Sequence, residues 1–95
     1  MPKGYIVANI RVTDAETFKG FGPLSAKAIE KYNGRVLVRN PVSEQREGEP
    51  RGVAVVVEFD DVETARAFYE SPEYTEARRL RDTCSSTDLI IVEGV

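Results

Sequence analysis

Apolar residues recur in this chain at two spacings, that of a strand and that of a helix. The order in which these two spacings alternate constrains the fold more than any other feature. Residues 4–12 (GYIVANIRV) repeat with the two-residue period of a strand, and residues 35–40, 53–59 and 88–94 are the other strand-like segments. Between the first and second of these segments, and between the third and fourth, apolar residues recur at helical spacing. The sequence therefore predicts the order βαββαβ.

This order is that of the split βαβ, or ferredoxin-like, arrangement. Right-handed crossovers place both helical segments on one face of a four-stranded antiparallel sheet, so we expect an α+β fold whose other sheet face is uncovered. A chain of 95 residues has the size of a single domain, here residues 1–95. Its core is small, so association through an apolar sheet face would add stability, which makes a homodimer plausible.

The first helical segment has recognisable start, interruption and end signals. Thr13 and Glu16 match a capping box with Thr13 at the N-cap, and the pair Asn33-Gly34 suits a left-handed C-terminal cap. Between them, residues 20–23 (GFGP) predict a kink or a break. The break could shape the mouth of a pocket, or it could only curve the helix over the sheet.

Charge and composition exclude several classes of function. Thirteen basic and sixteen acidic residues give a net charge of −3, which argues against a nucleic-acid partner. Residues 1–14 lack the pattern of a signal peptide, and no apolar run is long enough for a membrane span, so we expect a cytoplasmic protein with no membrane partner.

The residues available for chemistry are few. There is no histidine, and Cys84 is the only cysteine, so intramolecular disulfides, Cys–His pairs and ordinary zinc sites are excluded. No flavin or nucleotide motif is present, and we expect no cofactor and no metal. Cys84 lies on the apolar stripe of its helix, which favours buried packing over a reactive thiol.

Residues 70–81 (ESPEYTEARRLR) contain the most informative polar motif. Ser71 is a good N-cap, and Pro72 suits the first helical position. Tyr74, Arg78 and Arg81 follow at i, i+4 and i+7, so they share one stripe of the helix. This stripe could form a carboxylate or phosphate clamp at a pocket rim, or it could be a solvated flank.

The uncovered sheet face and the connection after the second strand are further candidate surfaces. Alternation assigns to this face a set of polar residues that we expect to dominate it: Tyr5, Asn9, Arg11, either Arg35 or Arg39, and also Glu58 and Glu93. Residues 42–51 are rich in charged and amide side chains and predict a mobile hairpin arm.

Four segments together resemble an uncharacterised family, domain of unknown function 1330, in the dimeric alpha/beta barrel superfamily. They are GYIVANIRVTD, YNGRVLVRN, VVVEFDDVETARAFYESPEYTEARRLR and DLIIVEG, and they cover nearly the whole chain. Phe68 stands where many relatives are expected to have tryptophan. The pairs Asn40-Pro41 and Gly22-Pro23 depart from the family pattern, and both departures would reshape a cleft rim.

The resemblance implies a homodimer of ferredoxin-like subunits with facing sheets and a cleft in each subunit between helices and sheet. Neighbouring families include cofactor-free monooxygenases of the antibiotic-biosynthesis type, muconolactone isomerase and haem enzymes, so the resemblance implies no particular reaction.

We therefore expect a protein that binds a small anionic or carbonyl-containing molecule in the cleft, with a cofactor-free enzyme as a variant of this hypothesis. The candidate ligand-binding residues are Asn9, Arg39, Ser71, Tyr74, Arg78 and Arg81. The alternative is a non-catalytic interaction or regulatory module that acts through the charged arm and a sheet edge. An RNA-binding domain is disfavoured, because the central strands supply one tyrosine and the net charge is negative.

Overall fold

A computed structural model describes residues 2–95 of the chain. Its elements follow the predicted order, with each helical segment divided in two. They are β1 (Gly4–Val12), α1 (Ala15–Phe18), α2 (Phe21–Lys31), β2 (Arg35–Asn40), β3 (Val53–Phe59), α3 (Val62–Glu70), α4 (Pro72–Cys84) and β4 (Ser85–Glu93).

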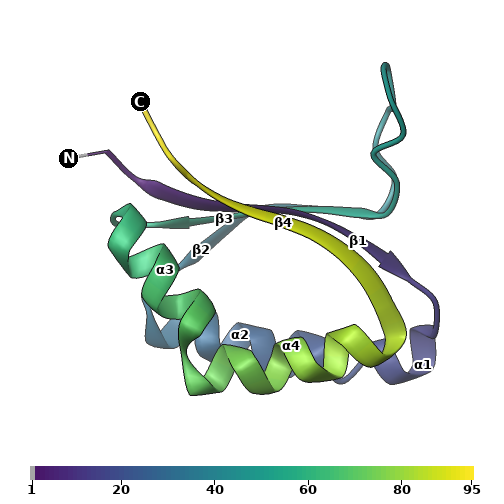
Figure 1. The fold of residues 1–95 in the computed structure, drawn as a ribbon, viewed down its shortest axis with the longest axis horizontal. Coiled ribbons are helices and arrows are strands. Elements are labelled where there is room, and N and C mark those ends of the chain that lie inside the picture. The colour runs from purple at the N-terminus through teal and green to yellow at the C-terminus, as the bar shows by residue number, and fades with distance from the viewer. Residues whose placement is uncertain (1) are drawn as a thin grey trace.

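The four strands form one antiparallel sheet in the order β2-β3-β1-β4. Within residues 2–95, all helices lie on one face of this sheet, and no helix lies over the other face (Figure 1). The predicted ferredoxin-like architecture is therefore confirmed. The arrangement brings β1, near the start of the chain, beside β4, at its end, over nine paired positions from Gly4–Glu93 to Val12–Ser85.

The core lies between the helices and the sheet. In β1 the even-numbered residues Ile6, Ala8 and Ile10 are buried on the helical side, as the strand period predicts. Phe68 on α3 is at the centre of an aromatic cluster, with ring centroids 4.9 Å from Phe59 and 4.5 Å from Tyr74. Cys84 is fully buried at the end of α4, as expected from its place on the apolar stripe.

The first helical segment is broken rather than kinked. α1 ends at Phe18 and α2 begins at Phe21, with Gly20 as the N-cap of α2. The predicted N-cap Thr13 is wrong by one residue, because the carboxylate of Asp14 accepts the hydrogen bond from the Thr17 backbone N–H at 3.3 Å.

The end of α2 confirms the predicted left-handed cap. Asn33 has a φ of 57°, a conformation that asparagine tolerates better than most residues. The next residue, Gly34, donates its backbone N–H to the Ile29 carbonyl at 2.8 Å. A side chain at Gly34 would also collide with the Phe59 ring, so both residues of the pair fit their positions.

The start of α4 also confirms the prediction. The Ser71 hydroxyl accepts a hydrogen bond from the Tyr74 backbone N–H at 3.1 Å and donates one to the Phe68 carbonyl at 2.7 Å. Pro72 occupies the first turn, where its missing N–H costs nothing. Ser71 is therefore both the C-cap of α3 and the N-cap of α4.

The uncovered face carries the expected polar residues and also a central apolar row that the sequence analysis did not identify. The register aligns one aliphatic side chain from each strand, namely Val38, Val56, Val7 and Ile90. Polar rows flank it: Tyr5 and Arg35 both donate to the Glu58 carboxylate at 2.9 Å. Arg11 lies near the other end of the face, 2.9 Å from the Ser86 hydroxyl.

One predicted member of this polar face, Glu93, lies on the other side of the sheet, and of the alternatives Arg35 and Arg39 only Arg35 belongs to the polar face. Glu93 pairs with Gly4, whose neighbours on the same side of β1 face the helices, so Glu93 belongs to the helical side. A β-bulge between Val36 and Val38 separates Arg35 from Arg39, which regular alternation would place on one face. Arg35 therefore faces the uncovered side, and Arg39 faces the helices.

The connection between β2 and β3 projects away from the sheet on the side opposite to the helices (Figure 1). Its residues are exposed, and Glu44–Arg46 and Glu49–Arg51 form ion pairs within it. The predicted charged arm is thus present. Among residues 2–95, no helix has the length and apolar character needed to cross a membrane.

Candidate functional site

A cavity of about 200 Å³ lies between the helical layer and the sheet. Its sheet side is formed by inward-facing residues of all four strands, and its helical side by residues of α1, α2, α3 and α4. The lining residues are Ile6, Ala8, Ile10, Phe18, Phe21, Gly22, Ser25, Ile29, Val36, Arg39, Val53, Val55, Val57, Phe68, Tyr74, Arg81 and Leu89.

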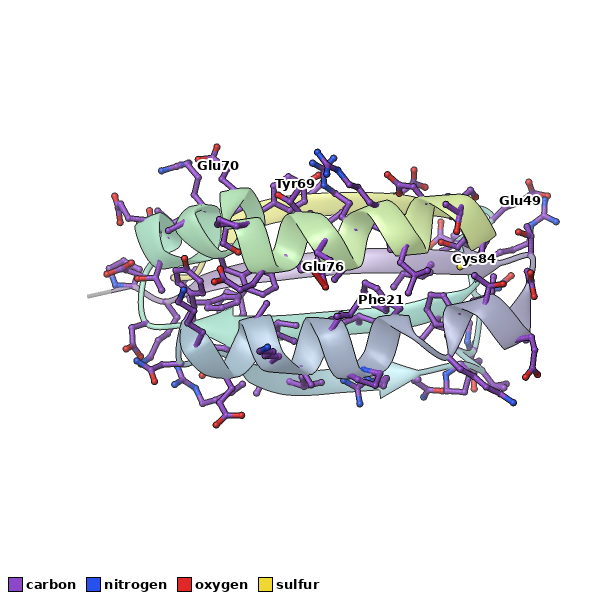
Figure 2. All side chains as sticks on the ribbon, turned by 90° about the horizontal axis from the view of Figure 1, so that it is seen from below. Phe21, Glu49, Tyr69, Glu70, Glu76 and Cys84 are labelled. Carbon is purple, nitrogen blue, oxygen red and sulfur yellow. The ribbon has the colours of Figure 1, made fainter. Side chains whose placement is uncertain are left out.

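The aromatic side chains of the cavity come from both helical segments. Figure 2, which views the helical layer, shows Phe21 on α2 pointing toward α4. The Phe21 ring stacks on Phe18 at 5.3 Å and meets Tyr74 edge-on at 6.5 Å. Phe18 at the end of α1 and Phe21 at the start of α2 both line the cavity, on either side of the separation at Gly20. The predicted helix break therefore lies beside a pocket.

Two buried polar residues of the cavity lining, Arg81 and Tyr74, are hydrogen-bonded to each other. Each is 5% exposed, and Arg81 Nη1 donates to the Tyr74 hydroxyl oxygen at 2.8 Å. Arg81 Nη2 lies 3.2 Å from a carboxylate oxygen of the exposed Asp82. Arg81 Nε is buried and has no hydrogen-bond partner among the described residues.

The geometry of α4 explains how these two side chains meet. They are seven residues apart, which is nearly two helical turns, so both project from the same side of α4. The Ser71 cap and Pro72 fix where α4 begins and therefore where Tyr74 lies. The stripe predicted from the sequence is thus partly a cavity wall, rather than a rim or a solvated flank.

Burial raises the pKa of the Tyr74 phenol above its usual value, and this effect outweighs the opposing effect of the Arg81 charge. The phenol is therefore protonated at neutral pH. The phenol oxygen accepts a hydrogen bond from Arg81. The O–H group can still rotate about its C–O bond and donate to another acceptor.

Arg39 is the second cationic residue of the cavity lining. It lies on β2 at the edge of the sheet and is exposed, whereas Arg81 is buried. The bulge at Val36–Val38 turns Arg39 toward the helices. Sequence alternation alone did not decide between the two faces for this residue.

The remaining predicted ligand-binding residues do not line the cavity. Asn9 pairs with Ala54 and Asp88 and lies on the uncovered face, as strand alternation predicted, so it is not part of the cavity lining. The Ser71 hydroxyl is used by the two bonds that join α3 to α4. Arg78 lies 5.4 Å over the Tyr69 ring, and Figure 2 shows Tyr69 on the side of α3 and α4 away from α2.

Sequence reasoning missed the aromatic lining of the site. Phe18, Phe21 and Phe68 appeared as periodic core residues, and only the interruption at residues 20–23 indicated that two of them lie beside a pocket. Among residues 2–95, no group of three or more Cys, Asp or Glu side chains is close enough to hold a metal ion. The cavity lining offers a metal no carboxylate either.

The fold and the cavity define a ferredoxin-like α+β protein with an apolar, arginine-containing pocket under its helices. The family model "Domain of unknown function (DUF1330)" matches residues 3–95, and the chain belongs to this family. No curated protein matches the chain.

Solved structures support the fold at low sequence identity. A protein of unknown function from Rhodopseudomonas palustris has 17% identity and a TM-score of 0.79, with 99% of this chain and 83% of that chain covered. SnoaB, a cofactor-independent oxygenase from Streptomyces nogalater, has 12% identity and a TM-score of 0.68, with 97% and 92% covered. A dimeric ferredoxin-like protein of unknown function from Bacteroides fragilis has 15% identity and a TM-score of 0.58, with 96% and 95% covered.

Proposed function

We propose that this protein is a homodimer that binds a small anionic or carbonyl-containing molecule in the cavity between helices and sheet. The observation that carries this proposal is a buried guanidinium, Arg81, beside a buried phenol, Tyr74, in a pocket whose other walls are mainly apolar. Ligand sites commonly combine such walls with a few convergent polar groups.

The energetics of Arg81 support a binding role. Burying a charged side chain is costly unless hydrogen bonds and an opposite charge compensate for the lost water. Asp82 supplies part of this compensation, but it is exposed, and Arg81 Nε has no partner within residues 2–95. An anionic or carbonyl oxygen in the cavity would supply the missing acceptor. Arg39 adds a second positive charge to the lining.

The homodimer is supported by the uncovered sheet face. The apolar row Val38, Val56, Val7 and Ile90 crosses the whole sheet, and Ile90 is 57% exposed. A second copy that packed its own row against this one would bury these side chains. The Bacteroides fragilis relative is dimeric, which agrees with this assembly.

Binding is the primary proposal, and catalysis is a variant of it. SnoaB, a relative in fold, is a cofactor-independent oxygenase, so this architecture can support chemistry without a cofactor. In this chain, Tyr74 is the lining residue that could carry a proton, and its raised pKa suits a donor rather than a base.

Native mass spectrometry of the protein purified from cells tests both parts of the proposal in one measurement. We expect the mass of two chains plus a retained small molecule. The double variant Arg39→Met/Arg81→Met should lose the retained molecule and keep the dimer. The matched control Arg66→Met/Arg79→Met removes two exposed arginines from α3 and α4 and should retain both.

A bare monomer would contradict the proposal. It would favour the alternative, an interaction or regulatory module, for which the exposed arm at residues 42–51 is the relevant feature. The arm lies on the same side of the sheet as the uncovered face (Figure 1), so one partner could contact both.

A further inference from the structure

The exposure of the lining residues shows where the cavity meets solvent. Tyr74 and Arg81 on α4 are each 5% exposed, and Phe68 on α3 is 2% exposed. On β2, in contrast, the lining residue Val36 is 39% exposed, and Arg39 is exposed as well. The cavity therefore extends from a buried end under α3 and α4 to an opening beside β2. We call this opening the cavity mouth.

The strand register connects the mouth to the interior. Arg39 pairs with Val55, Val55 with Ala8, and Ala8 with Leu89, and all four residues line the cavity. Exposure falls along this row, from the exposed Arg39 through the half-buried Val55 to Ala8, which is 5% exposed. A molecule that enters past Arg39 therefore meets an apolar floor that leads inward.

The side chain of Arg39 is free, unlike those of two other arginines on the sheet. Arg35 forms an ion pair with Glu58, and Arg11 forms one with Asp88. Within residues 2–95, Arg39 forms no ion pair and no side-chain hydrogen bond. The bulge in β2 places this unpaired charge on the side of the cavity rather than on the face that carries Glu58.

The rest of the lining adds to the positive charge of Arg39. Arg81 is a second cation, and no Asp or Glu is among the described lining residues. Asp82 pairs with Arg81 from an exposed position outside the lining, so it offsets at most one of the two charges. The Tyr74 hydroxyl accepts from Arg81 and keeps an O–H to donate. The cavity thus offers positive charge and hydrogen-bond donors to a molecule that enters it.

We propose that the cavity selects a small organic anion over an uncharged carbonyl compound, with Arg39 attracting the anion at the mouth and Arg81 and Tyr74 binding it inside. This inference rests on the proposed function, narrows its ligand class and gives Arg39 a separate role. An exposed charge at the rim of a site acts mainly on the association rate, whereas a buried charge that bonds to the ligand acts mainly on the dissociation rate. Binding kinetics should therefore separate the two arginines.

The test compares 4-fluorobenzoate with 4-fluorobenzamide, which have the same ring and a carbonyl group and differ mainly in charge. A volume of about 200 Å³ is below the range of about 300–1,000 Å³ for drug-sized ligands, and the rings of Phe18, Phe21 and Phe68 suit a planar apolar body. Fluorine NMR titrations give both affinities, and the line shapes give the association and dissociation rates. We expect the anion to bind at least about tenfold more tightly than the amide.

Variants of Arg39 test its role at the mouth. Arg39→Met should lower the association rate of 4-fluorobenzoate by about threefold to tenfold at low salt and change its dissociation rate by less than about twofold. Arg39→Lys keeps the charge and should retain the wild-type association rate. Sodium chloride at about 1 M should remove the difference between Arg39→Met and the wild type, because the Debye length falls to about 3 Å.

Variants inside the cavity should act on the other rate. Arg81→Met should raise the dissociation rate of 4-fluorobenzoate at least about tenfold. Tyr74→Phe removes only a hydroxyl and should raise it by about threefold to tenfold, and it serves if Arg81→Met does not fold. Arg79→Met is the matched control, because Arg79 is exposed on α4 and lies outside the lining. It changes the net charge as Arg39→Met does and should leave both rates unchanged.

The outcomes separate this inference from the proposed function. If the amide binds as tightly as the benzoate, or more tightly, the selection of an anion is overturned and a cavity for carbonyl compounds remains. An unchanged association rate in Arg39→Met, or an equal loss in Arg79→Met, would overturn the role of Arg39. Failure of both probes to bind the wild-type protein would overturn the proposed function together with this inference.

Discussion

At the scale of single residues, the candidate site depends on how two long side chains on α4 are turned. Tyr74 and Arg81 point into the molecule and bond to each other, while Arg78, between them in the sequence, stacks on Tyr69 outside the cavity. Helical spacing predicts that the three share a stripe. It does not predict which side of the stripe is covered, because that depends on where α2 packs.

Ser71 supports this arrangement without touching the cavity. Its hydroxyl caps α4 and also satisfies the Phe68 carbonyl. Ser71→Ala should lower the free energy of unfolding by about 1–2 kcal/mol, since both bonds are lost. Chemical denaturation would measure this loss. Ser43→Ala, an exposed serine in the arm, should change stability by less than about 0.5 kcal/mol. Equal effects of the two changes would show that the cap contributes nothing.

At the scale of elements, local capping signals set most boundaries. Asp61 begins α3 by accepting from the backbone N–H and the hydroxyl of Thr64, at 2.7 and 2.6 Å. Asp14 begins α1 in the same way with Thr17. The sequence indicated Thr13 for α1 because a capping box fits there, but the adjacent carboxylate is the residue that reaches the first turn.

The Asp61 cap predicts part of the acid sensitivity of the protein. The Thr64 hydroxyl and backbone N–H hold the pKa of Asp61 below its usual value. A lowered folded-state pKa means that the stabilisation is present above the unfolded-state pKa of about 3.9 and is lost as the pH falls through the folded-state value. Asp61→Asn keeps the cap and removes the titration, so its thermal stability should fall less steeply below about pH 4.

Thermal unfolding of the wild type and the Asn variant across that pH range would check this prediction. The Asp61→Ser variant carries another good capping residue that does not titrate in this pH range. Its thermal stability should also fall less steeply in acid than that of the wild type. An unchanged slope in both variants would mean that the Asp61 charge does not contribute to folding.

At the scale of the whole molecule, the uncovered sheet face is the surface through which we propose that two copies associate. The apolar row across the four strands lies between polar rows, with Tyr5, Arg35 and Glu58 bonded together on one side. These bonds satisfy the polar groups within one chain, so they can enter an interface without requiring polar partners from the second copy.

Ile90→Glu tests the assembly at the sheet edge. The new charge would be buried without a partner in a face-to-face dimer, so we expect this variant to be a monomer under conditions in which the wild type is a dimer. Light scattering coupled to size-exclusion chromatography measures the difference. Val42→Glu, at an 80% exposed position in the arm, is the control and should leave the mass unchanged. A dimeric Ile90→Glu variant would mean that another surface joins the subunits.

We could predict from the sequence the order of elements, the ferredoxin-like fold, the break near Gly20 and the caps at Ser71 and Asn33. Each of these follows from interactions between residues close together in the chain, such as strand alternation, helical spacing and side-chain bonds to the first turn. Only the tertiary contacts place Arg39 on the side of the helices and bury Arg81 against Tyr74. These outcomes depend on a bulge in one strand pair and on the packing of α2 against α4, and both are contacts between distant parts of the chain.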